Sequence, residues 1–356
     1  MNEAAGSTRA RRSRNRLAVD LTLLGLVGVL LVAAVAAGVA TLYREFYSPT
    51  AFVERYLSLL ADGHAAEALA LPGVAVDTPD LEGAGLPPTA SDALLRRDAL
   101  ASLSDVEVVS ETEQDGVSRV AVTYRAGGVD GRTTFSIERD GTIGVAPTWR
   151  FAESPLAVMD LVVRGSMSFD VNGFEIDKRQ VSPDGLDADP LAPVSLLVFS
   201  PAFYSVSVDT AISSTAGVGV LSDSPFSAVA VDVQAEPTEE FVAVVQQRVE
   251  EFLTSCATQQ VLQPTACPFG FYVQERIASE PVWSIVAQPV ITLVPDGAAW
   301  VIPDTEAIAH IDVDIRSLFD GSVRSVSEDV PFVLTALITV LPDGTATITV
   351  GGPGLP

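Results

Sequence analysis

The feature that most constrains this chain is a run without charged residues over residues 21–42. As a helix rising about 1.5 Å per residue, it reaches far enough to cross the hydrocarbon core of a bilayer, which is about 30 Å thick. The run is also longer than the apolar core of a secretory signal peptide, which has about 7–15 residues. We therefore expect an uncleaved transmembrane signal anchor over residues 17–43.

The charges beside this run predict its orientation. Five arginines precede it: Arg9, Arg11, Arg12, Arg14 and Arg16. On the far side Arg44 is balanced by Glu45. Since positive charge is retained in the cytoplasm, residues 1–16 are expected to form a basic cytoplasmic tail. The expected localisation is therefore the cell membrane, with a single pass and with the bulk of the chain outside the cytoplasm.

Two further features lie at the end of the run. Tyr43, Phe46 and Tyr47 directly follow it, and we expect them to form an aromatic belt at the outer interface. A cleaved signal peptide is the alternative, because Ala34-Val35-Ala36 offers small residues to a signal peptidase. Both hypotheses place the chain from residue 48 onward outside the cytoplasm.

The charge of the external part excludes one class of partner. Removing the first 42 residues takes five arginines, Glu3 and Asp20 from the 21 basic and 46 acidic residues, which leaves 16 and 44, a net charge of −28. Such a field repels nucleic acid, so no nucleic-acid partner is expected. Lys178 is the one lysine beside 20 arginines, and with abundant alanine, valine and glycine this composition resembles that of cell-envelope proteins from high-GC Gram-positive bacteria.

Both cysteines, Cys256 and Cys267, fall in the external part. An even count outside the cytoplasm predicts a disulfide, which would contribute about 3 kcal/mol by closing so short a loop. Two thiols with no nearby histidine cannot complete a zinc shell. Their spacing also differs from the Cys-x-x-Cys of redox pairs.

The external residues exceed what one core usually encloses, and we divide them into three segments: 48–153, 156–235 and 236–356. In the first, a helix is predicted over 49–61, a short one over 64–71 and another over 91–100. Strands follow over 106–112, 117–125, 132–138 and 148–151, with turns at Asp115-Gly116 and Asp140-Gly141. Helices followed by an antiparallel meander predict an α+β domain.

The order of elements in the first segment resembles the NTF2-like (cystatin-like) fold. The resemblance depends on the helix over 49–61 with its Asp62-Gly63 stop, the short alanine-rich second helix and the closing Trp149-Arg150-Phe151 strand. It implies a curved sheet wrapped on the first helix. Domains of this kind often follow a membrane helix in envelope proteins, usually without catalysis.

The second segment is predicted to be all-β. Asn172-Gly173 between alternating residues predicts a hairpin, and further strands are expected over 194–199 and 204–208. This pattern loosely resembles PEGA-like or immunoglobulin-like β modules.

The third segment is predicted to open with a helix over 238–255, whose apolar stripe includes Phe252. Strands are expected over 282–286, 290–293, 298–302, 307–315, 330–340 and 345–350. Turns are expected at Pro295-Asp296-Gly297 and Pro342-Asp343-Gly344.

Motifs for catalysis are absent from the sequence, which has no Walker loop, dinucleotide fingerprint, Gly-x-Ser-x-Gly elbow or His-Glu-x-x-His. Three weak groupings remain. His310, Asp312 and Asp314 share one face of a predicted strand and could bind a divalent cation, but a solvated strand face explains the same alternation and is favoured. A second possible calcium site is the loop of Asp184, Asp187 and Asp189. The third is His64 with an acid such as Asp92.

An enzymatic or ligand-binding NTF2-like cone would need His64 facing inward near an acid such as Asp92. Because His64 follows a helix stop, we instead expect it to face solvent. The sequence therefore predicts a non-catalytic single-pass envelope protein without a cofactor. Its anchor contacts the bilayer through residues 21–42, and its external modules bind a protein partner or a cell-wall component. A passive spacer is the remaining alternative.

Overall fold

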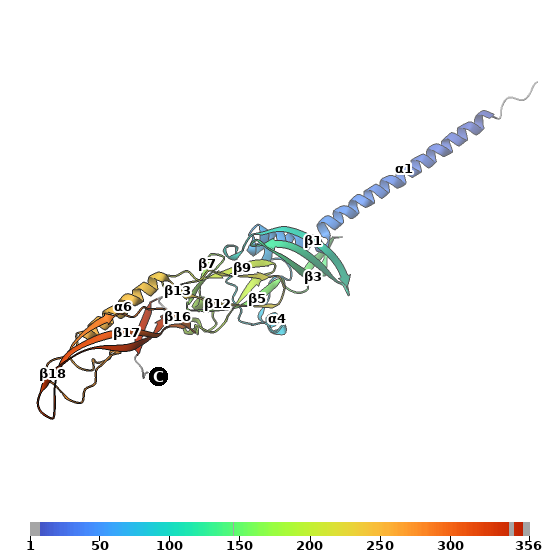
Figure 1. The fold of residues 1–356 in the computed structure, drawn as a ribbon. Coiled ribbons are helices and arrows are strands. Elements are labelled where there is room, and N and C mark those ends of the chain that lie inside the picture. The colour runs from blue at the N-terminus through green and yellow to red at the C-terminus, as the bar shows by residue number, and fades with distance from the viewer. Residues whose placement is uncertain (1–7, 145, 342–344, 352–356) are drawn as a thin grey trace, which may run out of the picture.

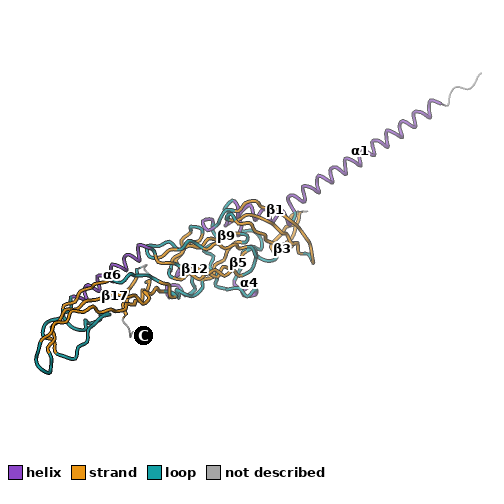
Figure 2. The backbone as a smooth tube through the Cα atoms, in the orientation of Figure 1, coloured by secondary structure: helices purple, strands orange, loops and turns teal. Residues whose placement is uncertain are grey.

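This computed structural model describes residues 8–144, 146–341 and 345–351, except for the side chains of residues 8–20 and 39–45. Antiparallel sheets dominate and helices are few, as expected. Figure 1 shows an elongated molecule in which α1 projects from one end and the β17–β18 hairpin forms the other. Figure 2 shows that the region between them consists mostly of strands and loops, with α4 and α6 among its helices.

Helix α1, Thr8–Tyr47, contains the apolar run. Among the described residues it is the one helix long and apolar enough to cross a membrane, with its window at Leu21–Gly38. No side chain in that window is buried against the rest of the protein. The expected interfacial Tyr43 and the five tail arginines lie outside the described side chains.

The first segment begins with α2, Pro49–Ala61, as predicted. Ser48 caps it by accepting a hydrogen bond from the Ala51 N–H at 3.1 Å, and Pro49 occupies the first turn. Three short helices follow: α3 Ala65–Leu69, α4 Thr78–Gly83 and the 3-10 turn η1 Arg97–Ala99. The sheet is a meander in the order β1-β2-β3-β4, with bounds Leu103–Gln114, Val117–Ala126, Val129–Ile143 and Ala146–Phe151.

Two predictions in this segment are wrong. Residues 91–100 form no long helix, because the Ser91 N–H donates to Ser195 and its carbonyl accepts from Leu197, so that tertiary pairing outweighs helical spacing. The turn expected at Asp140-Gly141 is a β-bulge between Arg139 and Gly141, and β3 continues to Ile143.

The second segment contains two sheets. One has the order β11-β9-β6-β7 and the other β12-β5-β8, in which β12 and β5 are parallel. The strands are β5 Leu156–Arg164, β6 Ser168–Val171, β7 Phe174–Asp177, β8 Val194–Phe199, β9 Ala202–Ser207, β11 Val218–Ser222 and β12 Ala228–Gln234. Short elements complete it: α5 Lys178–Val181, η2 Gly185–Asp187, and β10 Ser213–Ser214, which pairs with β13 Glu236–Pro237 at the start of the third segment.

One buried cluster runs through the first two segments, from Val53 to Ala235. Within it Tyr56 packs edge-on against Phe135 and Phe151, with ring centroids 6.0 and 5.2 Å apart. The Tyr56 hydroxyl donates to the Ser200 carbonyl at 3.1 Å, which joins α2 to the second segment.

The third segment has its own buried cluster, which includes residues from Phe241 to Ile338. It consists of α6 Glu239–Ala257 packed on a sheet in the order β14-β17-β18-β19, with β15 and β16 also paired to β17. The strand bounds are Arg276–Ile277, Val282–Ala287, Val294–Asp296, Ala299–Arg316, Val323–Val340 and Ala346–Gly351 for β14 to β19.

Two strand predictions here are wrong. Residues 290–293 form a loop, because the Ile291 N–H donates to the Gln246 side chain rather than to a neighbouring strand. The strands expected over 298–302 and 307–315 are one strand, β17, which passes Pro303 through an irregularity between Ile302 and Thr305. The predicted turn at 342–344 lies outside the described residues.

Candidate functional site

Helix α6 is fixed in the third segment by hydrogen bonds at its start and at its middle. Thr238 caps its start by accepting from the Phe241 N–H at 3.2 Å, and two glutamates occupy the first turn, where the helix dipole favours acids. Midway, the Gln246 side chain donates to the Pro289 carbonyl and accepts from the Ile291 N–H, both at 2.9 Å. These contacts fix α6 against the loop that precedes β16.

The end of α6 is held by the predicted disulfide. Cys256, in its last turn, is bonded to Cys267, and their Cα atoms are 5.9 Å apart. The buried stripe of α6 consists of Phe241, Val245, Val249, Leu253 and Cys256. Leu253 therefore takes the buried position expected for Phe252, which is half-buried and turned toward β19.

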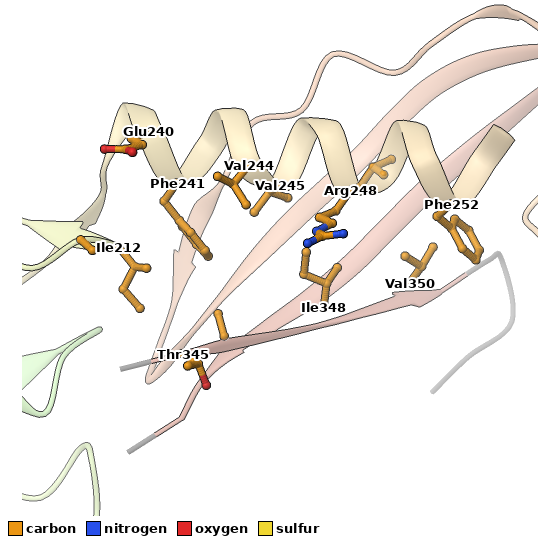
Figure 3. A pocket seen from close by; sticks show the side chains of 13 residues that line it. Ile212, Glu240, Phe241, Val244, Val245, Arg248, Phe252, Thr345, Ile348 and Val350 are labelled. Atoms are coloured by element: carbon orange, nitrogen blue, oxygen red, sulfur yellow. The ribbon is translucent and has the colours of Figure 1, made fainter. Parts of the chain in front are cut away.

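Between α6 and β19 lies a groove with a volume of about 690 Å³ (Figure 3). The helix contributes Phe241, Val244, Val245, Val249 and Phe252 to its lining. The strand contributes Ala346, Ile348 and Val350. Figure 3 shows the side chains of Phe241 and Ile348 extending into the space from opposite sides.

The strand side of this groove is a sheet edge. In the part of the chain that the structure describes, β18 is the one strand paired with β19, from Thr335↔Gly351 to Val340↔Ala346. Because side chains alternate, Ile348 and Val350 face the groove while Thr347 and Thr349 face away and are exposed. Such an edge can pair its backbone with an added strand whose alternate side chains enter the groove.

The charges around the groove belong to α6, since β19 carries none. The helix has four glutamates and one arginine: Glu239, Glu240, Glu250, Glu251 and Arg248. Arg248 is paired with Glu251 at 3.0 Å, so part of its charge is balanced within the helix. Of these, Glu240 and Arg248 line the groove, whose walls are otherwise mostly apolar.

The structure places His310, Asp312 and Asp314 on the outer face of β17, as the alternation predicts. The register sets them opposite Asp329, Ser327 and Ser325 of β18. His310 Nδ1 lies 2.6 Å from an Asp329 carboxylate oxygen, and Nε2 lies 3.1 Å from the Ser327 hydroxyl.

Those contacts decide how the His310 ring can be used. The hydrogen bond with Asp329 raises the pKa of His310, and the Asp312 charge adds to the effect. Asp314 accepts from the Ser325 hydroxyl at 2.6 Å. Both ring nitrogens are thus engaged by side chains, and among the described residues no group of three or more histidine, cysteine or acidic side chains is arranged to hold a metal ion.

The other two predicted groupings are also dispersed. Asp184, Asp187 and Asp189 are exposed, and the Asp189 carboxylate accepts from the Leu191 N–H at 2.8 Å. Beneath this loop the side chain of Lys178 is buried and donates to the Pro190 carbonyl at 2.7 Å. Burial lowers the pKa of that lysine.

His64 faces solvent and lies 3.9 Å from Glu67, beside the start of α3. Asp92 is exposed in the loop that pairs with β8. The interior beneath α2 is occupied by the packed rings of Tyr56, Phe135 and Phe151. The inward histidine and carboxylate that an enzymatic cone requires are therefore not brought together.

The groove was not predicted from the sequence, although the helix and the strand that form its two walls were. The available signals were Val244 and Phe252, which widen the apolar stripe of α6, and the alternation of residues 345–350. In comparisons with known proteins, the chain matches no family model, no curated protein and no solved structure.

Proposed function

We propose that this chain is a non-catalytic, single-pass envelope protein that binds an extended, cationic segment of another envelope protein in the groove between α6 and β19. The observation that carries the proposal is the edge of β19, which pairs among the described residues with β18 alone and borders an apolar groove of about 690 Å³. The backbone of β19 would supply hydrogen bonds, and the groove would take alternate apolar side chains.

The anchor is part of the same proposal. An apolar helix without buried side chains and a disulfide in the distal segment both support an N-terminus in the cytoplasm and an external bulk. For residues 48–153 we propose the NTF2-like fold, which α2 and the four-stranded meander support.

The negative charge of the external part favours a cationic occupant of the groove. The external part carries 16 basic and 44 acidic residues, and α6 itself carries four glutamates beside one arginine. A second copy of the chain would bring the same negative field to the groove and would be repelled. A partner strand with basic residues between its apolar ones is attracted instead, and apolar burial then supplies most of its affinity.

The test separates groove binding from simple charge attraction. The probe is a ten-residue peptide of alternating valine and arginine, titrated against the full chain in phosphatidylcholine nanodiscs. Val244, 48% exposed, lines the groove, whereas neighbouring Ala243 is exposed and does not line it. Val244→Asp and Ala243→Asp therefore add the same charge to the same helix turn.

We expect Val244→Asp to weaken peptide binding and Ala243→Asp to leave it equal or stronger. Equal strengthening by both variants would show that only charge is recognised, and absence of binding to the parent chain would refute a cationic strand as the occupant. In intact cells, a photo-crosslinking residue at Ile348 should capture one envelope protein through an extended segment. The same residue at Thr349, on the opposite face of β19, should not.

A further inference from the structure

A second apolar surface lies where α1 meets the first segment. Phe46 and Tyr47 at the end of α1, Phe52 of α2, and Ile143 and Trp149 of the β3–β4 hairpin line one hollow of about 400 Å³. Ile143 is 76% exposed and Phe46 is 66% exposed. This hollow is separate from the groove beside α6, and the function proposed above does not use it.

The hairpin is tied to the end of the anchor. The Trp149 indole N–H donates to the Tyr47 carbonyl at 2.8 Å, and Tyr47 is the last residue of α1. Ser48 follows directly and caps α2, so no linker separates the apolar helix from the first segment. Figure 1 shows β3 beside the end of α1.

The anchor sets the depth of this hollow. Tyr47 lies five residues beyond the apolar run 21–42, so a continuous helix places it about 8 Å past the hydrocarbon boundary. The headgroup region on each face of a bilayer is about 5–8 Å thick. Ile143 shares the hollow with Phe46 and Tyr47, which places it near the outer edge of the headgroup layer.

Charge at the hollow differs from that of the chain as a whole. Among the described residues that line it, the one charged side chain is Arg55, and none is a carboxylate. In a chain with 46 acidic residues, an apolar surface with one arginine is suited to the interface of a membrane, where aromatic side chains and arginine are both favourable.

We propose that this hollow is a lipid-contacting surface, in which Ile143 and Phe46 enter the headgroup layer of the bilayer that α1 crosses. The first segment then lies against the membrane instead of swinging about the end of the helix. The inference depends on the anchoring proposed above, and the experiment below distinguishes the failure of one from the failure of the other.

The test places an environment-sensitive nitrobenzoxadiazole label at residue 143. Ile143→Cys is labelled in the oxidised full chain, whose native cysteines are bonded to each other, and is reconstituted into phosphatidylcholine–phosphatidylglycerol vesicles. Phe319→Cys is the matched control, because Phe319 is 99% exposed at the tip of the β17–β18 hairpin, away from α1. Vesicle flotation measures anchoring, and quenching by spin-labelled lipids measures contact of the label.

We expect both labelled proteins to float with the vesicles. The label at 143 should emit at shorter wavelength and lose most of its intensity to lipid quenchers, while the label at 319 should do neither. Flotation without quenching at 143 would overturn the lipid-contacting surface and leave the anchor standing. If the emission of the label at 143 shifts with the number of proteins per vesicle but is not quenched by the spin-labelled lipids, the surface contacts a second copy of the chain and not lipid, which would also overturn the proposal. Failure to float would overturn the anchor itself.

Discussion

Tyr56 joins the first and second segments, and its hydroxyl can be removed without removing its ring. The side chain is fully buried, and its hydroxyl donates to the carbonyl of Ser200, which is also buried. In Tyr56→Phe the ring contacts with Phe135 and Phe151 persist, but the carbonyl loses this donor. Loss of one partner of a buried hydrogen bond costs about 1–3 kcal/mol, so we expect the free energy of unfolding to fall by that amount.

Hydrogen exchange measured by mass spectrometry locates the effect. Since the buried cluster runs from Val53 to Ala235 without a break, the amides of β2 and β9 should exchange faster by the same factor. A loss of about 1–3 kcal/mol corresponds to about 5- to 150-fold. The amides of β17 belong to the other cluster and should keep their rates.

Tyr272→Phe, at an exposed tyrosine of the third segment, is the control and should change no rates. If Tyr56→Phe accelerates exchange in β2 while β9 is unaffected, the two segments unfold separately and the reasoning from their shared cluster is refuted. Equal acceleration in β17 would refute the independence of the third segment.

Three further predictions concern the third segment. The pKa of His310 is raised in the folded protein above the ordinary 6.5, so its protonated ring should stabilise the β17–β18 pair fully below pH 6.5. This stabilisation should be lost as the pH rises through the raised pKa. Asp329→Asn removes the main cause and should lower the titration midpoint of His310 measured by NMR. Thr238→Ala removes the cap of α6 and should cost about 1 kcal/mol in urea unfolding. Replacing Cys256 and Cys267 together by serine should cost about 3 kcal/mol in the same assay.

Elements fixed by local chemistry could be predicted from the sequence. Asn172-Gly173 and Asp115-Gly116 form the expected hairpin turns, and all four residues have the positive φ angles that such turns require. Ser48 and Thr238 cap the helices that were expected over 49–61 and 238–255. Each of these outcomes depends on a residue and its immediate neighbours, so no knowledge of the distant chain was needed.

Elements fixed by distant pairing could not be predicted in this way. Residues 91–100 have helical spacing, yet Ser91 pairs with the edge of β8 about a hundred residues later. Strand β5 is buried almost throughout between β12 and β8, so it lacks the period-two alternation that identified other strands. In both cases the deciding partner is remote in sequence.

The same limit applies to the sites. Alternation placed His310 and its two aspartates on one face, but only the register with β18 shows that Asp329 and Ser327 engage the ring. The groove joins Val244 to Ile348 across about a hundred residues. No local pattern predicts that β19, among the described residues, pairs with β18 alone and leaves its other edge beside α6.

The two apolar surfaces differ in their charged surroundings, and this difference gives each a distinct salt dependence. At the hollow beside α1 the one charged residue among the described lining residues is Arg55, and the exposed Phe46 and Ile143 are apolar, so contact there depends mainly on burial and should persist in salt. At the groove, the attraction comes from the external part as a whole, with its 16 basic and 44 acidic residues, so approach of a cationic strand should slow as salt screens the field. Once bound, the strand is held by backbone pairing and buried side chains, which salt weakens little. Raising ionic strength should therefore lower the association rate at the groove far more than the dissociation rate, and should leave lipid quenching at residue 143 unchanged.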